Sequence, residues 1–420
     1  GMTAQNLLFH QTSARAICGP ASTLTAEHLT VNEANQFLLS GSLNLYNSLL
    51  VSLTNAGTAY GGAYNATPPS LGVFQSKGAA SHYLAPNSPH RNAGTSGISA
   101  SLLAELKRKT TYPPIELTAP FSASTTLAPQ APRDTDTPDL GYHYDPVDYV
   151  WTTLTLNNAT LTLTNGVAVA IYGPKGTTLQ SGARFITEGT PLNLNRLVRY
   201  QTVQEQPLVW GATASTLSLL DVVPASSPPE LRARFTEFSV LADGIGKRRL
   251  LATGGSTVGT AAWNDCQLRG VYLDLYNTSG PGMTLSLVNN LVQRSTFNWY
   301  QVVAPGYYPF TLNLYNNLFQ SSSLTLNDND STTAWTVRDN LFDTVSLGWG
   351  ASPVLNSHNA YKNTAQLPGG SANQLPTVTD YQTGPLGNYY YPTAGGSLSV
   401  LLDAGSRSAA TAGLYHYTVK

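Results

Sequence analysis

Apolar residues recur at every second position in short runs, and these runs repeat along the second half of the chain. Segment 285–292 reads LSLVNNLV, segment 312–319 reads LNLYNNLF and segment 335–342 reads WTVRDNLF. Alternation with a period of two is typical of strands that bury one face. Asn between the runs favours a turn, because it tolerates left-handed backbone angles. We therefore expect each repeat to hold about three short strands separated by turns.

The spacing of the repeats indicates how they pack. The reference residues Asn290, Asn317 and Asn340 lie 27 and 23 positions apart. A unit of this size cannot bury its apolar face alone, so it must stack on its neighbours. A leucine-rich repeat would need a consensus that is missing here, and a β-propeller would need a period of roughly 40 residues. The pattern therefore predicts an all-β fold, a single-stranded parallel β-helix with irregular loops and one short helix over 98–109.

A longer repeat divides the chain into two parts. Residues 140–144 read LGYHY and residues 413–417 read GLYHY, and they follow the related segments NAGT at 92–95 and DAGS at 403–406. We interpret residues 1–150 as a short partial β-helix unit with a closing tail and a Pro/Thr-rich linker at 113–132. Residues 151–420 form the main β-helix unit with a C-terminal cap. His143 and His416 are equivalent in the two tails, which favours a packing role.

The coils at 289–292, 316–319 and 339–342 resemble those of the right-handed parallel β-helix proteins, the pectate-lyase-like superfamily. The closing segments 134–144 and 403–406 resemble tails of large repetitive secreted or surface proteins of environmental bacteria. The resemblance implies a right-handed helix and a secreted or cell-surface location. It selects no activity, because the fold hosts lyases, hydrolases, epimerases, phage tailspikes and adhesins.

Composition narrows the classes of protein further. Charged residues make up 11% of the chain and the formal net charge is −1. No long basic block is present, which argues against a nucleic-acid partner, and no apolar run approaches the ~18 residues of a membrane span. Cys18 and Cys266 are too few for a disulfide framework, so we expect buried thiols. No signal peptide follows the first residues, so export would require a signal that has been removed or a longer chain.

A few acidic residues lie on the predicted coils. They are the basis of an alternative interpretation, in which the protein is an enzyme. Lyases of the resembled fold need a basic residue and acids that hold calcium. Asp328, Asp330 and Asp339, with Arg338, are the candidate catalytic residues of a polysaccharide lyase or glycoside hydrolase that works in a groove along the β-helix. The competing interpretation is a polar turn beside a surface Arg.

A second group of acids lies in the first closing tail. Asp134, Asp136 and Asp139 alternate with other residues as oxygen ligands of a calcium loop do, but the Gly and terminal Glu of an EF-hand are missing. We take these three residues as candidate calcium ligands, with a solvated connector as the alternative. No zinc-binding HxxxH or HExxH pattern occurs.

Aromatic residues within the coils give the candidate ligand surface. Trp299 and Trp349 share a column with Leu326, so we expect both Trp side chains in the core. Tyr300, Tyr307 and Tyr308 are the candidates for an exposed platform on which sugars stack. The favoured function is a non-enzymatic scaffold or adhesin module of a secreted or surface protein that contacts a glycan or polysaccharide.

Overall fold

The computed structural model describes residues 1–11, 16–17, 22–34, 38–53, 59–200, 205, 218–240, 249–252, 258–277, 282–301, 305–330, 335–351, 354–385 and 387–414. The chain forms two compact units. Unit 1 comprises Gly1–Glu116, Gln130–Val150 and Val203–Gln206, and unit 2 comprises Leu117–Pro129, Trp151–Thr202 and Pro207–Lys420.

Unit 2 is a right-handed parallel β-helix in which each coil passes through three parallel sheets in turn. Sheet A contains β11 (Thr125–Leu127), β14 (Thr160–Leu163), β17 (Arg184–Glu188), β20 (Glu230–Arg234), β23 (Thr260–Asn264), β26 (Thr284–Val288), β29 (Thr311–Tyr315), β32 (Thr336–Arg338) and β35 (Leu355–Ser357). Within unit 2, sheet B contains β15 (Ala168–Ile171), β18 (Asn195–Arg199), β21 (Thr236–Ser239), β24 (Gln267–Arg269), β27 (Leu291–Gln293), β30 (Leu318–Gln320), β33 (Leu341–Asp343) and β36 (Ala360–Lys362). Sheet C contains β13 (Leu154–Leu156), β16 (Lys175–Leu179), β19 (Ser218–Val222), β22 (Arg249–Ala252), β25 (Tyr272–Tyr276), β28 (Thr296–Gln301), β31 (Ser323–Asp328) and β34 (Ser346–Trp349).

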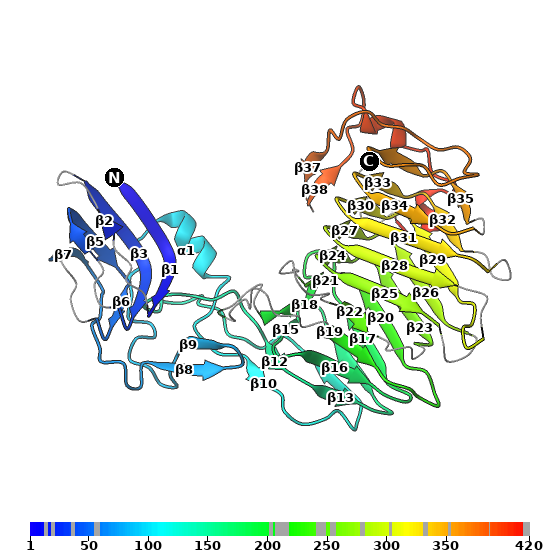
Figure 1. Ribbon diagram of the computed structural model, residues 1–420. Helices are drawn as coiled ribbons and strands as arrows, with labels where there is room; N and C mark the ends of the chain where they lie inside the picture. Colours follow the sequence, from blue (N-terminus) through cyan, green and yellow to red (C-terminus); the bar gives the residue numbers. More distant parts are fainter. Residues whose placement is uncertain are drawn as a thin grey trace. The chain divides into compact units, whose positions relative to one another are not determined.

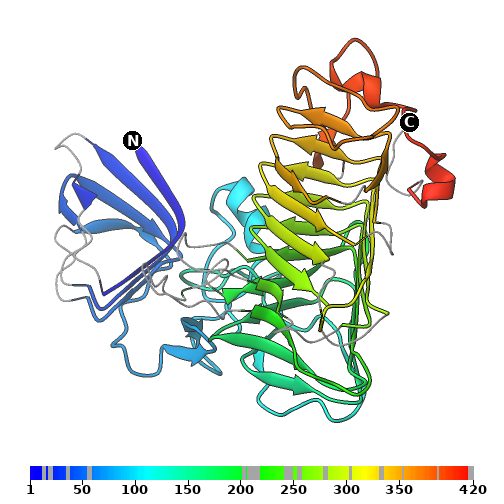
Figure 2. The same ribbon diagram turned by 45° about the vertical axis from the view of Figure 1, so that its right-hand side comes forward.

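Figures 1 and 2 show these strands stacked as successive rungs, coloured from green to orange. After the last coil come the antiparallel pair β37 (Gln382–Gly384) and β38 (Gly387–Tyr390), a 3-10 turn at Leu398–Leu401 and the helix α2 (Ala409–Ala412).

The observed register confirms the alignment of the repeats. Leu287 pairs with Leu314, which pairs with Val337, and all three side chains are fully buried. Equivalent apolar residues therefore stack directly on one another inside the helix. Each side chain in this column is covered by the coil before it and the coil after it. Removing its apolar surface from water stabilises the fold by roughly 25 cal/mol per Å².

The reference Asn residues lie next to the turns rather than on them. The left-handed positions belong to the preceding residues, Asn289 (φ 56°), Asn316 (φ 56°) and Asp339 (φ 61°). This backbone reversal turns the following side chain inward, so Asn317 is only 2% exposed. Its Oδ1 accepts hydrogen bonds from the Asn290 backbone N–H and side-chain amide at 3.0 and 2.9 Å. The repeated Asn thus forms a buried ladder between sheets A and B.

The two column Trp residues differ in burial. Trp299 is fully buried, as expected from its column. Trp349 pairs with Leu326 as the column predicts, but its side chain is 42% exposed. The prediction of a buried Trp349 is therefore wrong. It lies in β34, the last strand of sheet C, where no further strand of the sheet covers it.

Unit 1 also contains stacked parallel strands around an apolar core. Its main sheet has the order β1 (Met2–His10), β3 (Thr23–Asn32), β5 (Ser42–Tyr46) and β7 (Tyr60–Ala63), and β6 (Leu49–Val51) also pairs with β3. The remaining strands are β2 (Ala16–Ile17), β4 (Leu38–Ser40), β8 (Phe74–Lys77), β9 (Ala80–Leu84), β10 (Ile115–Glu116) and β12 (Tyr149–Trp151). Leu24 stacks on Leu43 and Ala26 on Leu45 in the core.

Three smaller predictions concern the helix, the thiols and the membrane. Helix α1 (Ala100–Leu106) confirms the expected short helix and buries Leu102 and Leu106. Cys266 is buried, and burial raises the pKa of its thiol to about 12. Cys18 lies outside the described residues. No helix of the described chain is both long and apolar enough to cross a membrane.

Candidate functional site

Tyrosine side chains gather on the outer face of sheet C. Tyr276 and Tyr300 are register partners on β25 and β28, where the burial pattern alternates and leaves both partly exposed. The rings of Tyr276 and Tyr307 lie 5.9 Å apart between centroids. Tyr307 and Tyr308 are 41% and 40% exposed. We call Tyr276, Tyr300, Tyr307 and Tyr308 the tyrosine surface.

Residues 305–310, which precede β29, place two of these tyrosines beside the sheet. The Tyr308 N–H donates to the carbonyl of Asn277 at 2.8 Å, directly after the end of β25. Gly306 has a φ of 85°, a left-handed turn that favours glycine. The loop is thereby held against the preceding coil. Tyr276 was missed in the sequence, although its place one coil before Tyr300 is the signal that identifies it.

Polar groups adjoin the tyrosine surface on the same two strands. Asp274 and Asn298 are register partners with partly exposed side chains. The Tyr272 hydroxyl donates to Asp274 Oδ2 at 3.3 Å and accepts from Asn298 Nδ2 at 3.1 Å. The outer face of sheet C therefore combines aromatic rings with hydrogen-bonding groups that face solvent.

Asp328 and Asp330 lie together at the end of β31. Asp328 is 1% exposed, and its Oδ1 accepts the Asp330 N–H at 3.0 Å and the Gln301 Nε2–H at 3.2 Å. Burial raises the pKa of the Asp328 carboxyl. Gln301 in turn accepts the N–H of Phe310 at 2.8 Å. These bonds order the turn after β31 around a buried carboxyl.

Asp339 and Arg338 lie at the other end of β32. Asp339 accepts the Ser406 N–H at 2.6 Å and its hydroxyl at 2.8 Å, and its side chain is 3% exposed. Arg338 is exposed. Because β32 separates Asp339 from Asp328 and Asp330, the structure places the candidate catalytic acids at two different corners of the coil.

The contact between Asp339 and Ser406 has a counterpart in unit 1. There the Thr95 N–H donates to Asn47 Oδ1 at 2.8 Å. Asn47 (φ 53°) and Asp339 (φ 61°) are both left-handed turn residues. The segments 92–95 and 403–406 thus dock on equivalent turns, which explains why the sequence repeats them. His416 lies outside the described residues.

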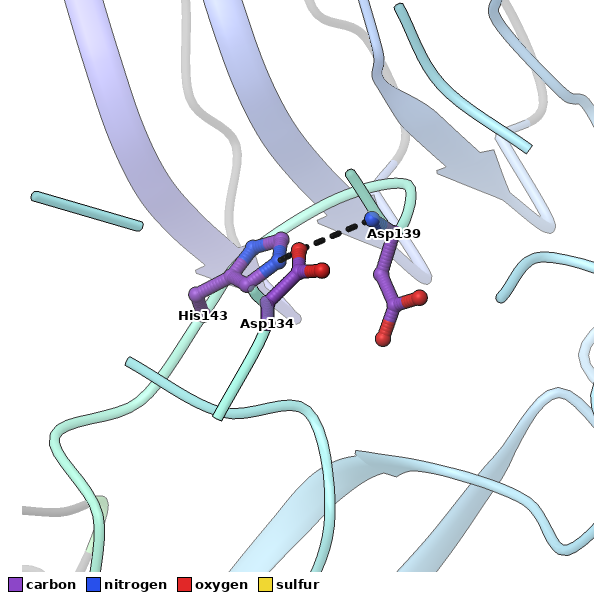
Figure 3. Close-up of side chains that lie close together, drawn as sticks. All are labelled: Asp134, Asp139 and His143. Atoms are coloured by element: carbon purple, nitrogen blue, oxygen red, sulfur yellow. Dashed lines mark hydrogen bonds and ion pairs between the residues drawn. The ribbon is translucent and has the colours of Figure 1, made fainter. Parts of the chain in front are cut away.

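The three candidate calcium ligands of the first tail differ in how far their side chains are buried. Asp134 and Asp139 are 8% and 4% exposed, whereas Asp136 points into solvent. Figure 3 shows Asp134 and Asp139 beside His143, which is fully buried. His143 Nε2 lies 2.6 Å from Asp134 Oδ2, and the Asp139 N–H donates to the same oxygen at 2.9 Å. Burial opposes ionisation of Asp134, but the bond from His143 and its charge lower the Asp134 pKa below its usual range.

The tail then contacts three left-handed turn residues of unit 1, Asn47, His28 and Asn6. Gly141 donates its N–H to the Asn47 carbonyl at 2.7 Å. His143 exchanges two bonds with the side chain of Asn6, at 2.7 and 2.9 Å. The Nδ1 atom of His28 lies 3.2 Å from the Gly141 carbonyl oxygen. Burial lowers the pKa of the His28 imidazole to about 3. The packing role expected for His143 agrees with these contacts.

A second buried cluster in unit 1 surrounds Glu205. Its carboxylate accepts the Ser81 hydroxyl at 2.9 Å and lies 2.9 Å from His82 Nδ1, and it also accepts the Tyr144 hydroxyl. His82 Nε2 is bonded to the Asn32 amide at 3.0 Å. In a Ser hydrolase the Ser hydroxyl bonds to Nε2 of the catalytic His. Here the Ser81 hydroxyl bonds to Glu205 instead, and His82 Nε2 bonds to Asn32.

Unit 1 is expected to lose stability in acid through Glu205. Burial raises the Glu205 pKa, but the bonds from His82 and Tyr144 outweigh burial and hold it at about 2, below the ordinary 4.5. A depressed carboxyl pKa stabilises the fold above the unfolded value, and this contribution disappears as pH falls from about 4.5 to about 2. For this partly exposed group we expect a loss of roughly 2 kcal/mol. Urea unfolding at pH 2 to 7 measures it, and Glu205→Gln should flatten the curve, whereas an unchanged curve would contradict it.

No protein-family model matches the chain, and no curated protein matches it. The parallel β-helix is therefore established by the stacked sheets themselves, and function has to be inferred from the surface groups described above.

Proposed function

We propose that the chain is a non-enzymatic β-helix module of a secreted or cell-surface protein, and that it binds glycans through the tyrosine surface. The observation that supports this proposal is the contact between Tyr276 and Tyr307, 5.9 Å between ring centroids, on a face where Tyr300 is the next rung. Aromatic rings offer a flat apolar area at little cost in side-chain entropy. The C–H face of a sugar ring can pack on such an area.

Hydrogen-bonding groups beside the rings fit the same ligand class. A sugar presents hydroxyl groups around its edge, and these require donors and acceptors next to the stacking surface. Asp274 and Asn298 supply a carboxylate and an amide from adjacent rungs of sheet C. Both lie on the strands that carry Tyr276 and Tyr300, so one extended ligand can contact rings and polar groups together.

The β-helix explains how the surface keeps its geometry. Alternate residues of β28 point into the core, where Phe297 and Trp299 are fully buried and stacked with 5.3 Å between ring centroids. The intervening Asn298 and Tyr300 are therefore held on a rigid support. A binding surface that is already ordered loses little further entropy when a ligand binds.

The double variant Tyr307→Ala/Tyr308→Ala is expected to weaken glycan binding at least tenfold, since aromatic side chains carry much of the affinity at such surfaces. A glycan array identifies a bound sugar, and calorimetry with that sugar compares the variant with the unchanged chain. Tyr64→Ala is the matched control, because Tyr64 is 55% exposed in unit 1 and should leave binding unaltered.

Two results would contradict the proposal. One is the absence of any bound glycan, or equal affinity for the chain and the double variant. The other is release of reducing or unsaturated sugar ends when the chain is incubated with polysaccharides, with and without calcium. Such release would favour the lyase or hydrolase alternative and could be traced with Asp328→Asn and Arg338→Gln.

A further inference from the structure

The buried group of Asp134, Asp139 and His143 holds an oxygen atom that lacks a partner. One ligand atom from each residue lies within 4.8 Å of the other two. The Asp134 side chain is 3% exposed, and its Oδ1 makes no hydrogen bond among the described residues. Figure 3 shows the Asp134 carboxyl group between the His143 ring and Asp139, with this second oxygen on the side of Asp139. A buried oxygen without a partner costs about 1–3 kcal/mol.

The histidine is oriented as a metal ligand would be. Its Nδ1 lies 3.0 Å from the Gly141 carbonyl, so Nδ1 carries hydrogen and donates. Nε2 then faces Asp134 Oδ2 at 2.6 Å. At this distance a proton lies between the two atoms, and a metal ion bound to Nε2 would replace that proton. A backbone carbonyl that fixes the other ring nitrogen is the usual support of a metal-binding His.

Asp139 is fixed by its neighbours and keeps capacity for another bond. Its Oδ1 accepts the Asn92 N–H at 2.8 Å, and its Oδ2 accepts the Thr111 hydroxyl. The Arg91 guanidinium lies 3.5 Å from Oδ2. Each carboxylate oxygen has two lone pairs, so Oδ1 can still bind a cation. The two carboxylates and the Arg91 guanidinium sum to one net negative charge, which a cation that replaces the Nε2 proton would balance.

We infer that Asp134, Asp139 and His143 bind one divalent transition-metal ion, with Zn²⁺ as the representative cation. Calcium takes six to eight oxygen ligands, whereas zinc combines imidazole and carboxylate in a four-coordinate site. Tetrahedral zinc holds its donor atoms about 3.4 Å apart. His143 Nε2 and Asp134 Oδ2 would therefore separate from 2.6 Å, and donor atoms up to 4.8 Å apart would approach one another. A water molecule would complete the coordination. The exposed Asp136 takes no part in this site.

Binding would fasten the closing tail of unit 1. Asp134 and His143 lie nine residues apart, and His143 is bonded to Asn6 on β1. A metal ion that links Asp134, Asp139 and His143 therefore closes the loop and holds the tail against the turns of the main sheet. Because the ion binds only the folded chain, unit 1 should unfold at a higher temperature when zinc is present.

Calorimetric titration of the full chain with Zn²⁺ tests the site. We expect one zinc ion per chain, a raised unfolding temperature, and binding at least tenfold weaker to Ca²⁺ than to Zn²⁺. Asp134→Asn and His143→Gln should each weaken zinc binding at least tenfold. Asp136→Asn is the matched control from the same loop and should bind zinc as the unchanged chain does.

X-ray absorption at the zinc edge of the unchanged chain gives a second readout that needs no variant. The expected spectrum shows one imidazole, oxygen ligands for the rest and no sulfur. The inference is overturned if zinc does not bind, if a folded His143→Gln chain binds it with unchanged affinity, if calcium binds equally well, or if the spectrum shows sulfur or several imidazoles.

Discussion

Replacing Asn317 with Leu is expected to lower the free energy of unfolding of unit 2 by about 4 kcal/mol. The substitution keeps a similar volume but removes the side-chain bonds of one rung of the Asn ladder. The backbone N–H of Asn290 loses its acceptor, and the Leu287 carbonyl loses a donor at 2.9 Å. The Asn340 Oδ1 also loses the amide donor at 2.9 Å. These groups are buried, so water cannot replace the lost bonds.

Urea unfolding followed by far-ultraviolet circular dichroism measures this loss. Asn313→Ala is the control, because Asn313 lies on β29 of the same coil with its side chain on the outer face. Its Oδ1 accepts only the Tyr315 hydroxyl, at 3.3 Å, among the bonds described. We expect the control to change stability by less than about 1 kcal/mol. Equal effects of both substitutions would contradict a special contribution of the ladder.

The coils could be predicted from the sequence because stacking in a β-helix is nearly one-dimensional. Each rung contacts the rungs before and after it, so similarity between segments such as 285–292 and 312–319 fixes their register directly. The error at Trp349 has the same origin. A column predicts burial only where another coil follows, and the repeat pattern does not mark the last strand of a sheet.

The candidate sites were less predictable, because loops and distant segments build them. Tyr307 reaches Tyr276 through the turn that begins at residue 305, before β29, and no repeated position in the sequence marks this contact. Glu205 meets Ser81 across 124 positions of sequence. Asp134 and Asp139 were recognised from their alternation, but the third member of the group, His143, reaches them through the left-handed backbone at Gly141. No period in the sequence encodes such contacts.

Replacing Gly141 with Ala is expected to destabilise unit 1 by about 4 kcal/mol and to release the closing tail. Gly141 has a φ of 84°, and a Cβ atom there would lie 2.4 Å from Thr30 Oγ1 and 2.9 Å from Leu49 Cδ1. The left-handed backbone costs an L-residue about 1–2 kcal/mol, and overpacking adds about 1–3 kcal/mol. The shift that relieves the clash also pulls the Gly141 carbonyl away from His28 and His143, which both bond to it.

Gly72→Ala separates the two causes, because Gly72 has a similar φ of 78° but no atom within 4 Å of the added Cβ. It should therefore show only the backbone cost, about 1–2 kcal/mol. Urea unfolding compares the two variants, and limited proteolysis should cleave the 134–144 segment faster in Gly141→Ala alone. Equal losses would mean that the close approach of Gly141 to Thr30 contributes nothing. A larger loss at Gly141 would show that its close approach to Thr30 and Leu49 requires glycine at this position.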